Sequence, residues 1–233
     1  MPLMSWKDYW ERLKDEQKVF HSEAIEYSAR LRRAVTLSEC WTVLDFGCGF
    51  GYVGRVLAPY VKEIYLWDEA ANMRQHARKS ISRNANAKLI DTANEEEFPP
   101  NMNFDLILVN SVIQYMRTED FSAWLSRWMG MLAPGGRIIV SDILAEHLRA
   151  LPDIFSLIPF SARRGFLFQA LKKGLKEMTW YFRMRRARPL RRYSLSELER
   201  VAAKANLEMS VLPENLTFRK GRISVILTAQ KNT

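Results

Sequence analysis

The sequence predicts an α/β fold in which seven strands form a mostly parallel sheet with an antiparallel last strand and helices on both faces. Short β-rich runs alternate with longer segments of helical periodicity, which is typical of a parallel sheet covered by helices. A glycine-rich turn follows the first run, and two short strands close the chain. The 233 residues suffice for a single domain with a sizeable core.

Five strands are predicted in the first part of the chain: 41–46, 63–67, 88–90, 104–110 and 137–142. The helical patterns between them fall at 51–58, 70–83 and 119–132. Pro134, Gly135 and Gly136 are typical of a helix end, and we expect them to turn the chain from the last of these helices into the fifth strand.

The carboxyl-terminal part predicts one helix and a strand pair. Ser194 and Glu197 have capping-box spacing, and Asn206 stands where a helix commonly stops. The strands that follow are predicted at 207–212 and 223–229, with a short turn-like segment between them. Because a parallel return would need a crossover of about a dozen residues or more, we expect antiparallel neighbours.

Composition excludes several classes of protein. With 48% hydrophobic and 26% charged residues, the chain is that of an ordinary globular protein. Its apolar runs fall far short of the roughly 20 residues that a membrane-spanning helix needs, and its amino terminus does not resemble a secretory signal. We therefore expect a cytoplasmic protein. Cys40 and Cys48 form no disulfide framework and no metal-ligand pattern, so no metal is predicted.

The formal net charge of +9 comes from one segment. Residues 151–192 hold 11 Lys or Arg against 2 acidic residues, whereas the rest of the chain is balanced. Within this segment, apolar residues recur at helical spacing, with basic residues between them. The stripe consists of Leu167, Leu171, Leu175, Met178 and Phe182.

The stretch VLDFGCGFG, residues 43–51, contains two overlapping glycine signatures. Glycines allow a backbone to approach a ligand closely, and ligands of open α/β sheets sit beyond the carboxyl ends of the strands. GxGxxG, from Gly49 to Gly54, is compatible with a dinucleotide such as NAD. The other signature, DxGxGxG, runs from Asp45 to Gly51.

In its context, DxGxGxG resembles motif I of the class I S-adenosylmethionine-dependent methyltransferases. Asp68 matches the acid that holds the ribose hydroxyls, and Asp91 matches the residue near the adenine amino group. Segments 104–116 and 131–142 resemble the fourth strand with its loop and the turn with the fifth strand. The resemblance covers roughly residues 40–150 and 193–230, and it implies a Rossmann-like fold and S-adenosylmethionine as cofactor.

The resemblance implies these cofactor-binding residues: Asp45, Phe46, Gly47, Cys48, Gly49, Gly51, Asp68, Glu69, Asp91, Thr92, Asn110 and Ser111. A carboxylate at a strand end can accept two charge-assisted hydroxyl bonds at once, which suits Asp68. Asp45 would be a poor neighbour for a pyrophosphate, so S-adenosylmethionine is favoured over NAD. Asp68 and Asp91 could alternatively act only as caps for a helix or a turn.

Gln114 and Tyr115, in the loop after the fourth strand, are the candidate catalytic residues that contact the acceptor. Many relatives carry a histidine near here, so Gln114 favours an acceptor that needs no deprotonation by histidine, although Tyr115 or a lid residue could serve as base. His21, His76 and His147 are isolated and are not predicted to be catalytic.

Two segments outside the resemblance are candidate covers of the site. Residues 1–38 predict an amino-terminal helical lid or a helix packed on the sheet. Its aromatic residues include Trp6, Tyr9, Trp10 and Tyr27, of which the two tyrosines are candidate lid contacts. Residues 151–192 predict a basic helical cap, which could be a solvated helix, could bind an anionic acceptor, or could attach to an anionic membrane.

The sequence thus predicts methyl transfer from S-adenosylmethionine to a small-molecule or lipid-linked acceptor, which the basic segment suggests is anionic. The alternatives are an inactive membrane-surface binding module, a nucleic-acid methyltransferase and an NAD-dependent oxidoreductase. Nucleic acid is disfavoured because Asn110 is followed by Ser-Val-Ile and not by the Pro-Pro-aromatic sequence of many base-amino methyltransferases. The sequence leaves the acceptor atom and the oligomeric state open.

Overall fold

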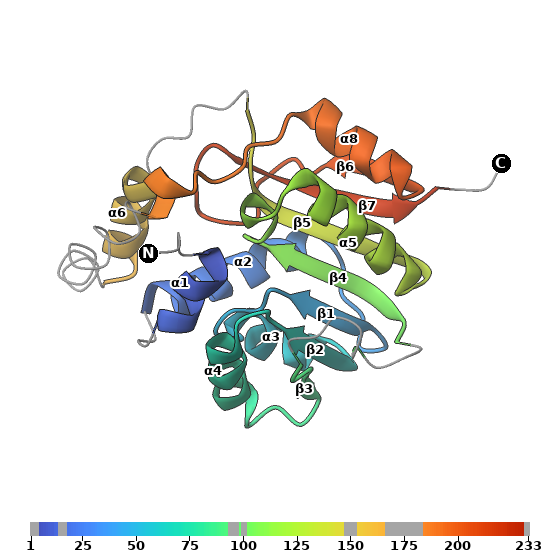
Figure 1. The fold of residues 1–233 in the computed structure, drawn as a ribbon. Coiled ribbons are helices and arrows are strands. Elements are labelled where there is room, and N and C mark those ends of the chain that lie inside the picture. The colour runs from blue at the N-terminus through green and yellow to red at the C-terminus, as the bar shows by residue number, and fades with distance from the viewer. Residues whose placement is uncertain are drawn as a thin grey trace.

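The fold is a single seven-stranded sheet with helices on both faces, as Figure 1 shows. The computed structural model describes residues 5–13, 18–92, 98, 102–146, 153–165 and 184–230. The strand order is β3-β2-β1-β4-β5-β7-β6. All neighbours in the sheet are parallel except β7, which runs antiparallel to both β5 and β6. The predicted fold class is therefore confirmed, including the antiparallel final pair.

The strands lie close to their predicted positions. They are β1 Thr42–Phe46, β2 Glu63–Trp67, β3 Ala87–Leu89, β4 Phe104–Asn110, β5 Leu132–Leu144, β6 Leu207–Val211 and β7 Arg222–Ala229. Six of the seven agree with the predicted ranges to within one residue at each end. Their burial explains this agreement, because the central strands are almost continuously apolar and are bounded by turns.

The fifth strand is longer than predicted, and the prediction of a turn at Pro134–Gly136 was wrong. The preceding helix ends at Gly130, and the chain already pairs with β4 at Leu132, opposite Phe104. The register then shifts between Phe104 and Leu106, and Gly135 has φ +79°. The glycine therefore serves an irregularity inside the strand rather than a turn before it.

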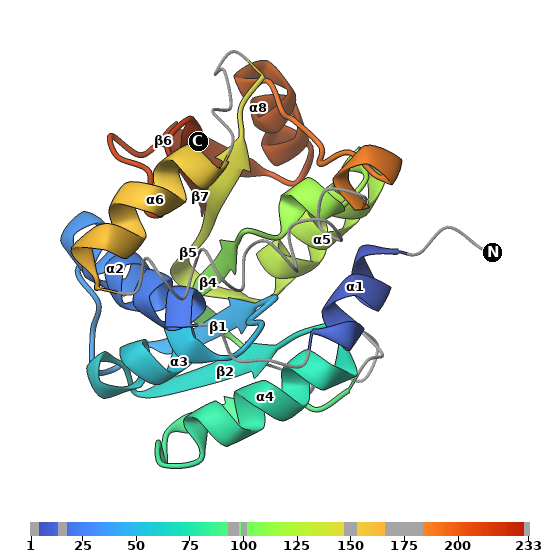
Figure 2. The same cartoon turned by 90° about the vertical axis from the view of Figure 1, so that its left-hand side faces the viewer.

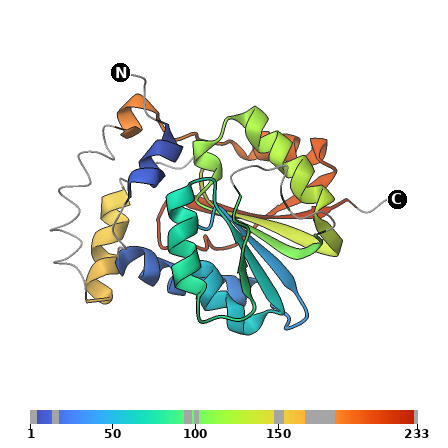
Figure 3. The same ribbon diagram turned by 60° about the horizontal axis from the view of Figure 1, so that its bottom comes forward.

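The helices are α1 Trp6–Arg12, α2 Lys18–Ala34, α3 Tyr52–Leu57, α4 Ala71–Ile81, α5 Thr118–Gly130, α6 Asp153–Arg163 and α8 Leu195–Lys204. Short 3₁₀ turns follow at η1 Ala58–Tyr60 and η3 Ile113–Tyr115. Buried residues of α5 and α8 pack on one face of the sheet, and those of α2, α3 and α4 pack on the other. Figures 2 and 3 show α1 apart from both layers, near the ends of the central strands.

One face of the sheet is covered by an aromatic cluster. The ring centroid of Phe46 lies 4.4 Å from that of Trp124 and 4.8 Å from that of Trp128, and Trp67 packs beside them. Trp128 is fully buried, and its indole Nε1 has no hydrogen-bond partner in the part of the chain that the structure describes. The cluster joins β1, β2 and α5 beneath the ends of the strands.

The carboxyl-terminal helix begins and ends as predicted. The Ser194 hydroxyl accepts a hydrogen bond from the Glu197 backbone N–H at 3.1 Å, which is one half of a capping box. The Glu197 carboxylate instead accepts from Thr118 and Arg191, so it ties α8 to α5. Asn206 has φ +57°, the left-handed conformation common after a helix.

The basic segment is described only in part. The apolar stripe predicted between Leu167 and Phe182 lies outside the described residues. α6 packs through Phe160, whose ring stacks on Phe218 at 4.1 Å, and Arg164 next to it pairs with Glu26 of α2 at 2.9 Å. Among the helices that the structure describes, none is long and apolar enough to cross a membrane.

Replacing Trp128 with alanine should destabilise the fold by about 3 to 5 kcal/mol, because it opens a large cavity in the aromatic cluster. Trp128→Phe should cost much less, since it keeps most of the ring volume and removes a buried N–H. Denaturant unfolding of both variants measures the difference. Equal costs would contradict packing as the reason for this tryptophan.

Candidate active site

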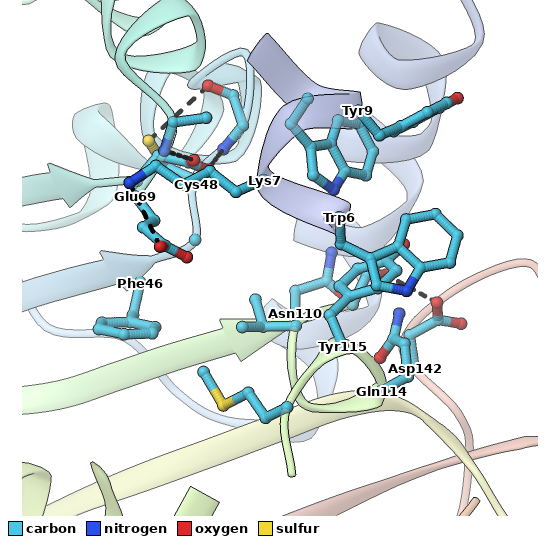
Figure 4. A pocket seen from close by; sticks show the side chains of 18 of the residues that line it. Trp6, Lys7, Tyr9, Phe46, Cys48, Glu69, Asn110, Gln114, Tyr115 and Asp142 are labelled. Atoms are coloured by element: carbon cyan, nitrogen blue, oxygen red, sulfur yellow. Dashed lines mark hydrogen bonds and ion pairs between the residues drawn. The ribbon is translucent and has the colours of Figure 1, made fainter. Parts of the chain in front are cut away.

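A cavity of about 750 Å³ opens at the carboxyl ends of β1, β2, β4 and β5. Its size falls in the range of small-molecule sites, roughly 300 to 1,000 Å³. The turn after β1 and the end of β2 form one side, and the loop after β4 with the end of β5 forms another. Residues of α1 complete the wall, as Figure 4 shows for Trp6, Lys7 and Tyr9.

The glycines after β1 have different tasks. Gly51 has φ +71°, and a Cβ there would stand 2.9 Å from the Cα of Ala77, so this glycine lets α4 pack against the turn. Gly49 has φ +53°, but a Cβ there would meet nothing within 4 Å. Gly49 lines the cavity, and it is the glycine of the turn beside which the structure leaves room for a ligand.

Asp68 lies at the end of β2 and faces the cavity. Its Oδ2 accepts a hydrogen bond from the Gly49 N–H at 2.9 Å, and its Oδ1 accepts one from the Ala70 N–H at 2.9 Å. Each carboxylate oxygen keeps a second acceptor position. Desolvation raises the pKa of Asp68 to about 6, although both backbone bonds oppose this rise.

Asp45 is buried behind the turn and does not line the cavity. Desolvation, together with a smaller effect of the Asp68 charge, raises the pKa of its carboxyl group to about 7. Its Oδ2 has no hydrogen-bond partner among the described residues. A buried carboxylate oxygen without a donor is unfavourable, so this position suits an ordered water that donates a hydrogen bond to it.

Asp91 and Thr92, which the sequence predicts to bind the cofactor, lie outside the cavity lining. The carboxylate of Asp91 pairs with Arg74 at 3.3 Å and also with Arg78, both on α4. The Thr92 carbonyl accepts a hydrogen bond from the Trp67 indole at 2.9 Å. The contact of these two residues with the cofactor therefore stays a prediction. Trp67 itself lines the cavity, as do Phe46 and Trp124.

The remaining residues predicted to bind the cofactor line the cavity: Phe46, Gly47, Cys48, Gly49, Glu69, Asn110 and Ser111. Gly51 is in the turn but not in the lining. Burial keeps the pKa of the Cys48 thiol well above its ordinary value, so this thiol stays protonated. Glu69 is 62% exposed on its side chain and pairs with Lys7 of α1 at 3.4 Å.

Tyr27 is not a lid contact. It is fully buried between α2 and the sheet, where its hydroxyl accepts a hydrogen bond from Ser141 at 3.2 Å. Ser141 also lies 3.1 Å from the Oδ1 of Asn110, at the neighbouring strand end. Burial raises the pKa of Tyr27. Tyr27 therefore contacts Asn110 only through Ser141, whereas Tyr9 lines the cavity.

Asp142 organises the opposite end of the cavity, and the sequence analysis did not assign it to the site. Its Oδ2 accepts from the Ser111 hydroxyl at 2.7 Å, and its Oδ1 accepts from Thr217 at 2.9 Å. Arg219 and Arg222 approach it at 3.5 and 4.0 Å. The signal was present, because Asp142 follows the apolar run of β5 as Asp68 follows that of β2.

The backbone at this end is in an unusual conformation. Ser111 and Asp142 have φ values of +59° and +61°, which non-glycine residues seldom adopt. Such conformations cost of order 1 kcal/mol and persist where surrounding contacts fix them. Glu23 of α2 adds a further restraint by pairing with Arg219.

The candidate catalytic residues lie where α1 meets the loop after β4. The ring of Tyr115 is 4.8 Å from that of Trp6 and 6.1 Å from that of Trp10. Gln114 is only 4% exposed and lines the cavity, and its Oε1 has no partner among the residues described. Figure 4 shows Gln114, Tyr115 and Asp142 at the same end of the cavity.

Comparison with known proteins identifies the family. A family model described as a methyltransferase domain matches residues 9–211, which is most of the chain. The chain belongs to this family. The resemblance predicted from the sequence to the class I S-adenosylmethionine-dependent methyltransferases is therefore confirmed.

Individual relatives share between 13% and 32% of their aligned residues with this chain. The uncharacterized methyltransferase Rv0089 of Mycobacterium tuberculosis is 32% identical over 130 residues, which are 54% of this chain and 61% of Rv0089. Among solved structures, magnesium protoporphyrin IX methyltransferase of Synechocystis PCC 6803 with bound S-adenosylmethionine has a TM-score of 0.57 at 13% identity, covering 98% of this chain and 93% of that one.

The S-adenosylhomocysteine-bound form of CalO1, a methyltransferase in calicheamicin biosynthesis, has a TM-score of 0.58 at 20% identity and covers 88% of this chain and 54% of that one. At such identities the likeness shows the fold. The chain spans less than two thirds of the length of curated relatives such as Rv0089.

Asp142→Asn should lower the free energy of unfolding by about 3 kcal/mol, because it takes the carboxylate charge away from the buried Arg222 and from the partly buried Arg219, which keeps Glu23, while asparagine still tolerates the left-handed backbone. Thr217→Val removes one neutral hydrogen-bond donor to the Asp142 carboxylate and should cost about 1 kcal/mol of unfolding free energy. Denaturant titration checks both values, and an unchanged midpoint for Asp142→Asn would show that the arginines are balanced elsewhere.

Proposed function

We propose that this chain transfers a methyl group from S-adenosylmethionine to a small-molecule acceptor. The observation that carries the proposal is the pairing of Asp68 with Gly49 at the edge of the cavity, in a member of the methyltransferase family. The cofactor, when bound, supplies an electrophilic methyl group on a sulfonium. The protein must therefore hold donor and acceptor in line and exclude water.

The residues beside the turn after β1 and the end of β2 suit the nucleoside of the cofactor. Asp68 offers one remaining acceptor position on each oxygen, which matches two neighbouring ribose hydroxyls. Gly49 leaves room beside the backbone, and the orphaned oxygen of Asp45, behind the turn, suits an ordered water that would link it to the ligand. Phe46, Trp67 and Trp124 provide an apolar wall for a purine.

The residues at the other end suit the acceptor. Gln114 can accept a hydrogen bond from an N–H or O–H group, and Tyr115 lies beside it with its ring held by α1. Arg188, Arg219 and Arg222 line this end, and guanidinium groups suit carboxylate and phosphate, which supports an anionic acceptor, lipid-linked or free. The solved neighbours include methyltransferases of magnesium protoporphyrin IX and of calicheamicin biosynthesis, which supports a small molecule.

Asp68→Ala should weaken S-adenosylmethionine binding by about 1.5 to 3 kcal/mol, because the hydrogen bonds to the ribose would be charge-assisted. Glu63→Gln is the matched control, since Glu63 begins the same strand and pairs with Lys88. Calorimetric titration measures both. An unchanged affinity in Asp68→Ala would assign this aspartate to the turn alone, and binding of NAD instead would overturn the proposal.

The same titration has a defined pH dependence. Because the pKa values of Asp68 and Asp45 are about 6 and about 7, the free protein holds protons there that a donor ligand displaces. Affinity should therefore fall as pH is lowered from about 8 to about 5, and binding near pH 6 should release protons. Proton uptake on binding would contradict this assignment.

The acceptor class can be tested with methyl-labelled cofactor and separate small-metabolite, lipid and nucleic-acid fractions. We expect label in the metabolite or lipid fraction, and preferentially in anionic compounds because of the arginines. Label confined to nucleic acid would overturn the acceptor class. Absence of label in every fraction, together with liposome binding that depends on residues 163–188, would favour an inactive membrane-surface module.

A further inference from the structure

The amino end of α4 has no cap of its own. Its N-cap residue is Ala70, which has no side chain able to accept a hydrogen bond. The first backbone N–H groups of a helix lack partners within the helix and must find them elsewhere. In α4 this end directly follows Asp68 and Glu69, so whatever caps it also restrains the end of β2.

The missing cap comes from α1. The Glu11 carboxylate accepts the Ala71 N–H at 2.7 Å through Oε1 and the Asn72 N–H at 3.0 Å through Oε2. Asp68 accepts the Ala70 N–H just before them. Three successive N–H groups are therefore capped by two carboxylates, one of which is the proposed ribose acid.

The capping is reciprocal. The side-chain amide of Asn72 donates to the Leu13 carbonyl at 2.7 Å and to the Trp10 carbonyl at 3.3 Å, at the carboxyl end of α1. α1 caps its own amino end through Ser5 and Asp8, whereas at its carboxyl end Asn72 adds to the one backbone bond from the Leu13 N–H to the Trp10 carbonyl. A helix of seven residues is too short to be stable alone, so α1 depends on such contacts.

α1 forms one wall of the cavity. Trp6, Lys7, Tyr9 and Trp10 all line it, and Trp6 and Trp10 hold the ring of Tyr115. Figure 3 shows α1 over the ends of the strands, next to the start of α4. A ligand beside Asp68 and Gly49 would therefore have α1 as one wall of its site.

We propose that Glu11 and Asn72 form a reciprocal cap that holds α1 closed over the cofactor, with Glu11 as the positioning residue that limits how fast S-adenosylhomocysteine leaves. The inference rests on the proposed function, in that the cavity holds the cofactor, but it is independent of the acceptor. Because Asp68 and Glu11 restrain the same helix end, ligand binding and α1 docking should strengthen each other.

The test uses the full chain and three variants at the cap. Glu11→Ala removes both acceptors, whereas Glu11→Gln keeps one. Asn72→Asp replaces the donors to the α1 carbonyls with acceptors, yet an acid in the first turn still suits the amino end of α4. Gln75→Ala is the control, because Gln75 is exposed on the same helix and lies outside the cavity lining.

Two readouts separate the cap from the cofactor. Hydrogen exchange over residues 5–13 in the ligand-free protein reports α1 docking. Chasing tritiated S-adenosylhomocysteine with excess unlabelled compound reports its release. Glu11→Ala and Asn72→Asp should raise the exchange and speed release about tenfold, Glu11→Gln should be intermediate, and Gln75→Ala should match the wild type.

Unchanged exchange in both Glu11→Ala and Asn72→Asp would overturn the cap. Raised exchange with unchanged release would overturn the gate, because α1 would then lie off the exit route. Failure of the proposed function has a different signature. A wild-type protein that binds no S-adenosylhomocysteine overturns the proposed cofactor and the gate together, while exchange in the ligand-free protein still reports whether α1 is held by the cap.

Discussion

The hydrogen bond from the Gly49 N–H to the Asp68 carboxylate connects the turn after β1 to the end of β2, and the geometry of the site depends on it. A carboxylate in this position is costly because the surrounding protein replaces water, and the two backbone donors offset part of that cost. The turn can approach Asp68 only because Gly51 lets α4 pack closely behind it. The position of the turn relative to the Asp68 carboxylate therefore depends on the register of β1 and β2, on close packing at Gly51 and on the charge of Asp68.

The other end of the cavity is fixed in a different way. There the buried Asp142 accepts hydrogen bonds from Ser111, just after β4, and from Thr217 in the β6–β7 loop. Arg219 of that loop and Arg222 of β7 balance its charge. The left-handed residues Ser111 and Asp142 are held by these contacts. This end is thus built from segments far apart in sequence.

The success and failure of sequence reasoning follow this division. The strands and the placement of Asp68 could be predicted because apolar periodicity and glycine spacing are local signals. The start of β5 could not, because the pairing of Leu132 with Phe104 overrides the turn preference of Pro134–Gly136. The contacts of Glu11 with α4 and of Asp142 with Thr217 join residues roughly 60 and 75 positions apart, and no local pattern encodes them. The sequence likewise leaves Tyr27 open between a lid contact and a helix packed on the sheet, because its burial depends on tertiary packing.

The aromatic cluster beneath the strand ends has a consequence for observing the protein. Trp67 and Trp124 belong to the packed interior and also form part of the cavity wall. Indole emission responds to the polarity and stacking of its immediate surroundings. Occupancy of the cavity should therefore change the intrinsic spectrum of the protein, so that binding can be followed optically without any attached dye.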